Sequence, residues 1–68
     1  MSEAVHPLRT IRIAHGWTQH QLAAKSNVST HTIWRTELHG NVPFRYTQKK
    51  LLKALGLSYE MRDEVFPR

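Results

Sequence analysis

Apolar residues recur at helical spacing in short stretches of this chain, and residues that form turns separate the stretches. Leu8 and Ile11 begin the first stretch directly after Pro7, a residue suited to the first turn of a helix, and Gly16 ends it. No stretch alternates between apolar and polar residues over the length of a strand. The pattern therefore predicts an all-α fold, a compact bundle of five short helices.

Polar capping residues mark where the second and third helices begin. Thr18, followed three residues later by Gln21, has the form of a capping box and predicts a helix that ends near Lys25. Ser29 caps a third helix, which is expected to end between residues 38 and 40. Only about four residues separate these two helices, which favours a tight turn between them.

Two further helices are predicted after the loop over residues 40–43. The fourth runs from about residue 44 to residue 55 and ends at Gly56, and Ser58 caps a last short helix that ends before Pro67. The expected apolar side of the fourth helix consists of Phe44, Thr47, Leu51 and Leu55.

The second and third helices together have the pattern of a helix-turn-helix over residues 18–38. The small Ala23 and Ala24 allow close approach of the two helices, Val28 fills the joint, and Ile33 faces inward. Two short helices that cross steeply leave the second one free to enter a DNA major groove, which is about 12 Å wide.

The outer side of the third helix carries side chains suited to recognising bases. They offer hydroxyl and imidazole hydrogen bonds, an apolar ring for a thymine methyl, and a guanidinium for guanine. These expected base contacts are Thr30, His31, Trp34 and Arg35. For Trp34, packing on the helix or contact with a partner stays open, and His31 has the alternative of a surface residue without a role. Thr18 and Gln19 open the preceding helix, whose free N–H groups favour a phosphate.

Charge agrees with a polyanionic partner. The chain has 68 residues and a net charge of +5. Up to Leu55 it has eight basic and two acidic residues, whereas from Gly56 onward it has two basic and three acidic ones. Because many small proteins have basic surfaces for solubility alone, charge by itself leaves nucleic-acid binding undecided.

Composition argues against several other classes of protein. The length predicts one domain over residues 1–68, with residues 1–6 as a flexible arm. Without cysteine, and without a histidine pair at ligand spacing, we expect no metal and no other cofactor or small-molecule ligand. No acid pair or glycine-rich phosphate loop points to an enzyme. Neither a membrane span nor a signal peptide is evident, so the expected location is the cytoplasm, at the nucleoid.

Several motifs, taken as a set, resemble the lambda-repressor-like, or Cro/XRE-type, helix-turn-helix domain. They are Leu8–Arg12, Gly16–Gln19, Gln21–Ala23, Val28–Ser29, Thr32–Ile33, Arg35, Glu37, Pro43 and Leu51–Ser58. The resemblance implies a five-helix DNA-binding domain of a transcriptional regulator, often dimeric on a palindromic site. A phage-, plasmid- or mobile-element-type repressor or small regulator is the expected kind of protein.

The resemblance also implies roles for single residues. Gln19 matches a phosphate contact, and Thr32 lies close to the DNA backbone or to a base. Arg45 lies where the family often meets the backbone, and Arg12 with Glu37 matches an internal ion pair between the first and third helices. The expected phosphate contacts are therefore Thr18, Gln19, Thr32 and Arg45.

Three positions depart from the pattern of the family. Thr36 stands in place of a large aliphatic residue, which predicts a thinner core behind the third helix. Trp34 occupies a position that is usually small or polar. His39 replaces a glycine that here comes one residue later, at Gly40, so the third helix is expected to end differently.

The C-terminal segment has more apolar residues than a small core needs. Three of them recur every four residues, which predicts an apolar stripe that joins two copies into a homodimer. The expected interface is Leu57, Met61, Val65 and Phe66. The alternative function is a protein-interaction module or antitoxin of the same fold, whose partner would bind Trp34 and the C-terminal helix.

Overall fold

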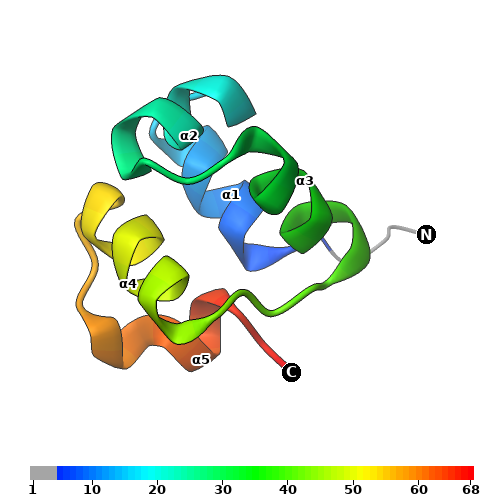
Figure 1. Cartoon of the computed structure of the whole chain (residues 1–68), viewed down its shortest axis with the longest axis vertical. Helices are drawn as coiled ribbons and strands as arrows, with labels where there is room; N and C mark the ends of the chain where they lie inside the picture. The colour runs from blue at the N-terminus through cyan, green and yellow to red at the C-terminus, as the bar shows by residue number, and fades with distance from the viewer. Residues whose placement is uncertain (1–4) are drawn as a thin grey trace.

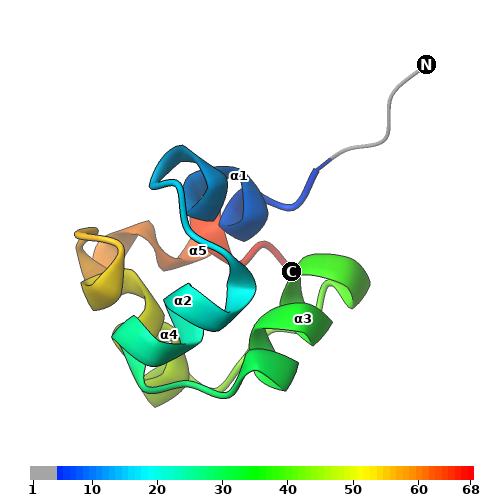
Figure 2. The same ribbon diagram turned by 90° about the horizontal axis from the view of Figure 1, so that it is seen from above.

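Six short helical segments follow one another along residues 5–68, the part of the chain that the computed structural model describes. They are α1 (Pro7–Ala14), α2 (Gln19–Ser26), α3 (Thr30–His39), α4 (Arg45–Ala54), the 3₁₀ turn η1 (Tyr59–Met61) and α5 (Arg62–Val65). α2 packs against both α3 and α4, while α1 packs against α3 and α5 (Figure 1, Figure 2). The predicted all-α fold is confirmed, with η1 and α5 together forming the fifth helix.

The helix ends lie where the sequence pattern places them. Thr18 and Gln21 form the predicted capping box: the Thr18 hydroxyl accepts from Gln21 N at 3.1 Å, and Gln21 Oε1 accepts from Thr18 N at 2.8 Å. Ser29 Oγ accepts from Thr32 N at 3.1 Å at the start of α3. Ser58 differs, because it lies at the N-cap position of η1 but its side chain makes no capping hydrogen bond.

His6 caps α1. The sequence assigned it to a flexible arm with residues 1–5, but its Nδ1 accepts a hydrogen bond from Leu8 N at 3.1 Å. Residues 1–4 lie outside the described part of the chain. Partial burial lowers the pKa of His6, and the nearby Glu37 carboxylate offsets part of that shift. The neutral imidazole is therefore the form that stabilises the fold.

Acidification is expected to weaken this cap. Below about pH 6.5 the unfolded chain binds a proton at His6 that the folded chain resists, so this stabilising contribution is complete above that pH and is lost as the pH falls. His6→Asn retains a good N-cap acceptor without a titrating group. Urea unfolding at pH 7 and pH 5 is expected to show a smaller loss of stability for His6→Asn than for the wild type. Equal losses would show that the cap does not titrate.

The core lies where α1, α2, α3, α4 and α5 meet. Its fully or almost fully buried apolar residues are Leu8, Leu22, Val28, Ile33, Leu51, Leu52, Leu55, Val65 and Phe66. Val28 fills the joint between α2 and α3, and Ile33 faces inward from α3, as predicted. Thr36 is also fully buried, and its Oγ1 has no hydrogen-bond partner among residues 5–68.

The apolar side of α4 differs from the predicted one. Phe44 is 80% exposed, because the helix begins at Arg45 and leaves Phe44 at the N-cap, outside the helical stripe. Gln48 and Leu52 instead join Leu51 and Leu55 at the core. The buried amide of Gln48 has a hydrogen-bond partner, because its Nε2 donates to the carbonyl oxygen of Pro43 at 3.0 Å. This bond connects the α3–α4 loop to α4.

The C-terminal apolar stripe belongs mainly to the core of one chain. Val65 is 0% and Phe66 1% exposed, so their assignment to an interface between two copies is wrong. Both residues belong to the core, and α5 packs against α1. Leu57 is half-buried against the same core, and Met61 remains 37% exposed.

Candidate nucleic-acid interface

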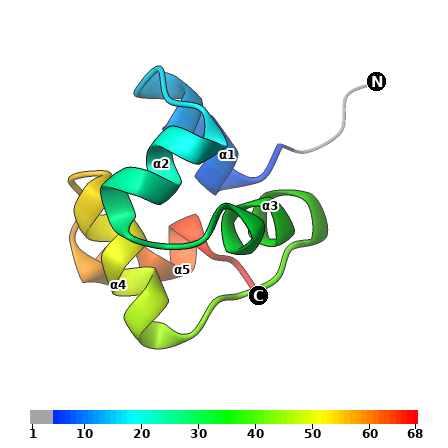
Figure 3. The ribbon, with the colours of Figure 1, turned by 45° about the horizontal axis from the view of Figure 1, so that its top comes forward.

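α2 and α3 form the predicted two-helix unit with a tight turn. Residues 27–29 connect the helices, and Asn27 adopts a left-handed conformation with φ 59° that ends α2. The backbone N–H of Val28 donates to the carbonyl oxygen of Ala23 at 3.2 Å. This turn sets α3 across α2, at the edge of the molecule (Figure 3).

A buried ion pair holds α3 to α1. Arg12 donates to Glu37 through Nε at 2.7 Å and through Nη2 at 2.9 Å, a bidentate arrangement with side chains only 10% and 1% exposed. Arg12 Nη1 also donates to the carbonyl oxygen of Trp17 at 2.7 Å. Gln19 Nε2 adds a bond to Glu37 Oε1 at 3.1 Å. The structure thus brings together Arg12 and Glu37, the pair that the resemblance implies, and fixes the start of α2 to the same carboxylate.

The side chains expected to contact bases lie along one side of α3. His31, Trp34 and Arg35 are exposed, and Thr30 is half-buried. Their exposure contrasts with the burial of Ile33 on the same helix. One side of α3 therefore contacts the core, and the opposite side is open to a partner.

Aromatic contacts order the outer side of α3. The ring of Trp34 stacks on His31 with a centroid distance of 5.6 Å and meets the edge of His39 at 4.9 Å. The hydroxyl of Thr30 lies 3.1 Å from Nδ1 of His20, a bond that joins α2 to α3. His31 and Trp34 consequently present one continuous aromatic surface rather than two separate side chains.

Arg35 has a partner that the sequence pattern does not reveal. With its amide oxygen turned toward the guanidinium, Asn41 accepts from Arg35 Nε at 3.3 Å and from Nη2 at 2.8 Å. The Asn41 backbone N–H also donates to the Arg35 carbonyl at 3.4 Å. This contact follows from the left-handed end of α3 at Gly40, which returns the chain toward Arg35.

The residues expected to contact phosphates lie at the starts of three helices. Thr18 and Gln19 open α2, Thr32 lies in the first turn of α3, and Arg45 is the first residue of α4. Thr18, Gln19 and Thr32 already have hydrogen bonds within the protein, Thr32 through Ser29 Oγ at 2.8 Å. Arg45 is exposed.

A cleft of about 380 Å³ separates α3 from the start of α4. His31, Arg35 and the buried Thr36 line it from α3, and Phe44 and Tyr46 line it from the other side. Phe44 and Tyr46 are strongly exposed aromatic residues beside the outer side of α3. Reasoning from sequence missed them as surface residues, since Phe44 fits the periodicity of the core.

Within residues 5–68, no three histidine or acidic side chains gather where they would hold a metal ion. In the same part of the chain, no helix has the length and apolar character needed to cross a membrane.

Comparison with known proteins adds one finding to this geometry. A family model described as a helix-turn-helix domain matches residues 4–65, nearly the whole chain. No curated protein and no solved structure matches the chain.

Proposed function

Because the chain belongs to the helix-turn-helix domain family, we propose that it is a transcriptional regulator that binds double-stranded DNA at specific sequences. The observation that carries the proposal is the division of α3 into two sides. Ile33 and Glu37 anchor one side in the core, while His31, Trp34 and Arg35 are exposed on the other. A bare helix with such a polar and aromatic outer side suits insertion into a major groove.

Base recognition is assigned to Thr30, His31, Trp34 and Arg35 under this proposal. Arg35 is the strongest of them, because a guanidinium matches the two acceptors of guanine and Asn41 already orients it. Contacts to phosphates are assigned to Thr18, Gln19, Thr32 and Arg45, which lie at helix starts where free N–H groups favour an anion.

Two copies on a palindromic site would supply the specificity that one short helix lacks. Val65 and Phe66 are buried in the core. Of the expected interface residues, Leu57 and Met61 therefore remain accessible to a second copy. So small an apolar surface favours a dimer that is weak in solution and assembles on DNA. The proposed setting is the cytoplasm, at the nucleoid, and the proposed kind of protein is a small repressor of a phage, plasmid or mobile element.

Arg35→Ala is expected to weaken binding to the preferred duplex by about 1–3 kcal/mol and to reduce discrimination against random duplex. The preferred duplex is first selected from a random pool, and affinities are then measured by fluorescence anisotropy at one fixed salt concentration. Arg9→Ala, which removes an exposed arginine from α1, is the matched control and should preserve discrimination. Unchanged discrimination in Arg35→Ala would contradict base recognition by Arg35.

The exposed aromatic residues favour one second candidate, binding to a protein partner. Phe44 and Tyr46 are exposed and share a cleft with His31 of α3, and Trp34 and Leu38 are also exposed on α3. Large exposed apolar residues that gather in one place mark interaction sites in many proteins. A salt series with random duplex separates the candidates, because affinity for phosphates falls steeply as salt rises, whereas an apolar interface is insensitive to it.

A further inference from the structure

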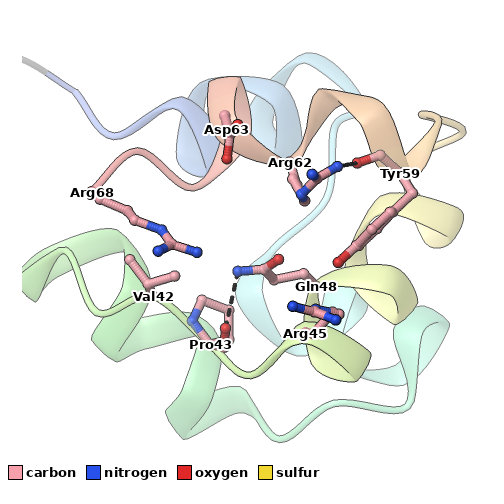
Figure 4. A pocket seen from close by; sticks show the side chains of 8 residues that line it. All are labelled: Val42, Pro43, Arg45, Gln48, Tyr59, Arg62, Asp63 and Arg68. Atoms are coloured by element: carbon pink, nitrogen blue, oxygen red, sulfur yellow. Dashed lines mark hydrogen bonds between the residues drawn. The ribbon is translucent and has the colours of Figure 1, made fainter.

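A second hollow lies on the other side of the α3–α4 loop. It has a volume of about 940 Å³, and Val42 and Pro43 form a wall that it shares with the cleft beside α3. α4, η1, α5 and the C-terminal residue complete its lining (Figure 4). None of the expected DNA contacts except Arg45 lies here.

Three arginines from three parts of the chain line this hollow. Arg45 comes from the start of α4, Arg62 from α5, and Arg68 from the C-terminal segment. Asp63 is the one acidic residue in the lining. No described residue forms an ion pair with any of the three arginines, since the ion pair of residues 5–68 is Arg12 with Glu37. The hollow therefore keeps an excess of positive charge.

Two features make the hollow a built site rather than a group of loose surface charges. Arg62 is held in place, because its guanidinium lies 4.6 Å from the Tyr59 ring centre and Nη1 donates to the Tyr59 carbonyl at 3.3 Å. Gln48 is more than nine-tenths buried and is fixed by its bond to Pro43. Figure 4 shows the Gln48 amide and the Arg68 guanidinium turned toward the same open space.

We infer that this hollow binds a phosphate group. Guanidinium groups match the oxygens of phosphate in pairs, and the arginines that line this hollow favour phosphate over a monovalent anion. Phosphate reaches a protein either in the DNA backbone or on a free phosphorylated molecule. The shared Val42–Pro43 wall favours the backbone as the source, because it joins the hollow to the cleft beside α3, the helix on which the duplex is proposed to lie. That assignment of the source rests on the proposed function.

The first arm of the test uses inorganic phosphate with the full chain. Phosphate at constant ionic strength, with chloride as the comparator, is expected to give saturable NMR shifts of the Gln48 side-chain amide and of Arg62 Nε–Hε. Arg45→Gln combined with Arg68→Gln should abolish them, while Lys53→Gln, which removes an exposed charge from the same helix, should retain them. The absence of saturable shifts in the wild type would overturn the site.

The second arm uses the duplex selected from a random pool. Arg68→Gln is expected to reduce the slope of log affinity against log salt by about 0.9, the value for one lost phosphate contact, with base preference unchanged. Lys53→Gln should keep the wild-type slope. An unchanged slope in Arg68→Gln would overturn the DNA backbone as the source, and phosphate shifts in the first arm would then identify a free phosphorylated ligand. If the wild type binds no duplex, the proposed function fails and the first arm alone decides the site.

Discussion

Glu37→Ala is expected to lower the free energy of unfolding by about 3–5 kcal/mol, since it leaves the buried guanidinium of Arg12 without its counter-charge. Arg12 would retain one bond, to the Trp17 carbonyl, and Gln19 would lose its partner. A small domain has a total stability of about 5–15 kcal/mol, so the variant should be partly unfolded at room temperature. Urea denaturation followed by circular dichroism measures the loss.

The double variant Arg12→Met with Glu37→Leu is the control for this effect. It removes both charges and fills the space with apolar side chains, which is often neutral or stabilising for a buried pair. We expect it to be more stable than Glu37→Ala. Small and additive effects of Arg12→Met and Glu37→Leu on their own would contradict the burial of the pair.

Phe66→Ala is expected to lower the free energy of unfolding by about 3–5 kcal/mol, because it removes a ring that is almost completely buried in the core. The loss should be independent of protein concentration, since the ring packs within one chain. Thermal melts over a hundredfold range of concentration provide the measurement.

Met61→Ala is the matched control, because Met61 belongs to the same C-terminal segment but keeps exposed surface. Its expected loss is below about 1 kcal/mol. If the loss in Phe66→Ala disappeared at low protein concentration, Phe66 would belong to an interface between copies after all.

Local features of this fold were predictable from the sequence. Two helix caps, the capping box of Thr18 with Gln21 and the cap at Ser29, are examples. Each depends on residues three apart in the sequence, so it can be recognised without knowledge of distant packing. The inward side of α3 was predictable because Ile33 is an apolar residue on a helix whose other side is polar. Even the burial of Thr36, a departure from the family pattern, follows from its position on that helix.

Features that depend on distant packing were not predictable. An apolar residue at a helix end fits the periodicity of the core whether or not the helix includes it, which is why Phe44 was misplaced. The apolar stripe at the C-terminus could not be divided between core and surface, because only the fold shows that Val65 and Phe66 are buried and that α5 packs against α1. The arginine hollow joins residues from α4 and α5 that no short motif connects.

The two-sided construction of α3 has a consequence for how this protein can evolve. Exposed positions tolerate most substitutions within about 0.5 kcal/mol, whereas buried ones do not. His31 and Arg35 can therefore be exchanged during divergence while Ile33 and Glu37 stay constant and preserve the scaffold. Trp34 is more constrained, because its ring is in contact with both His31 and His39. New target preferences would then arise most readily at position 35, where the penalty in folding is limited to the exposed contact with Asn41.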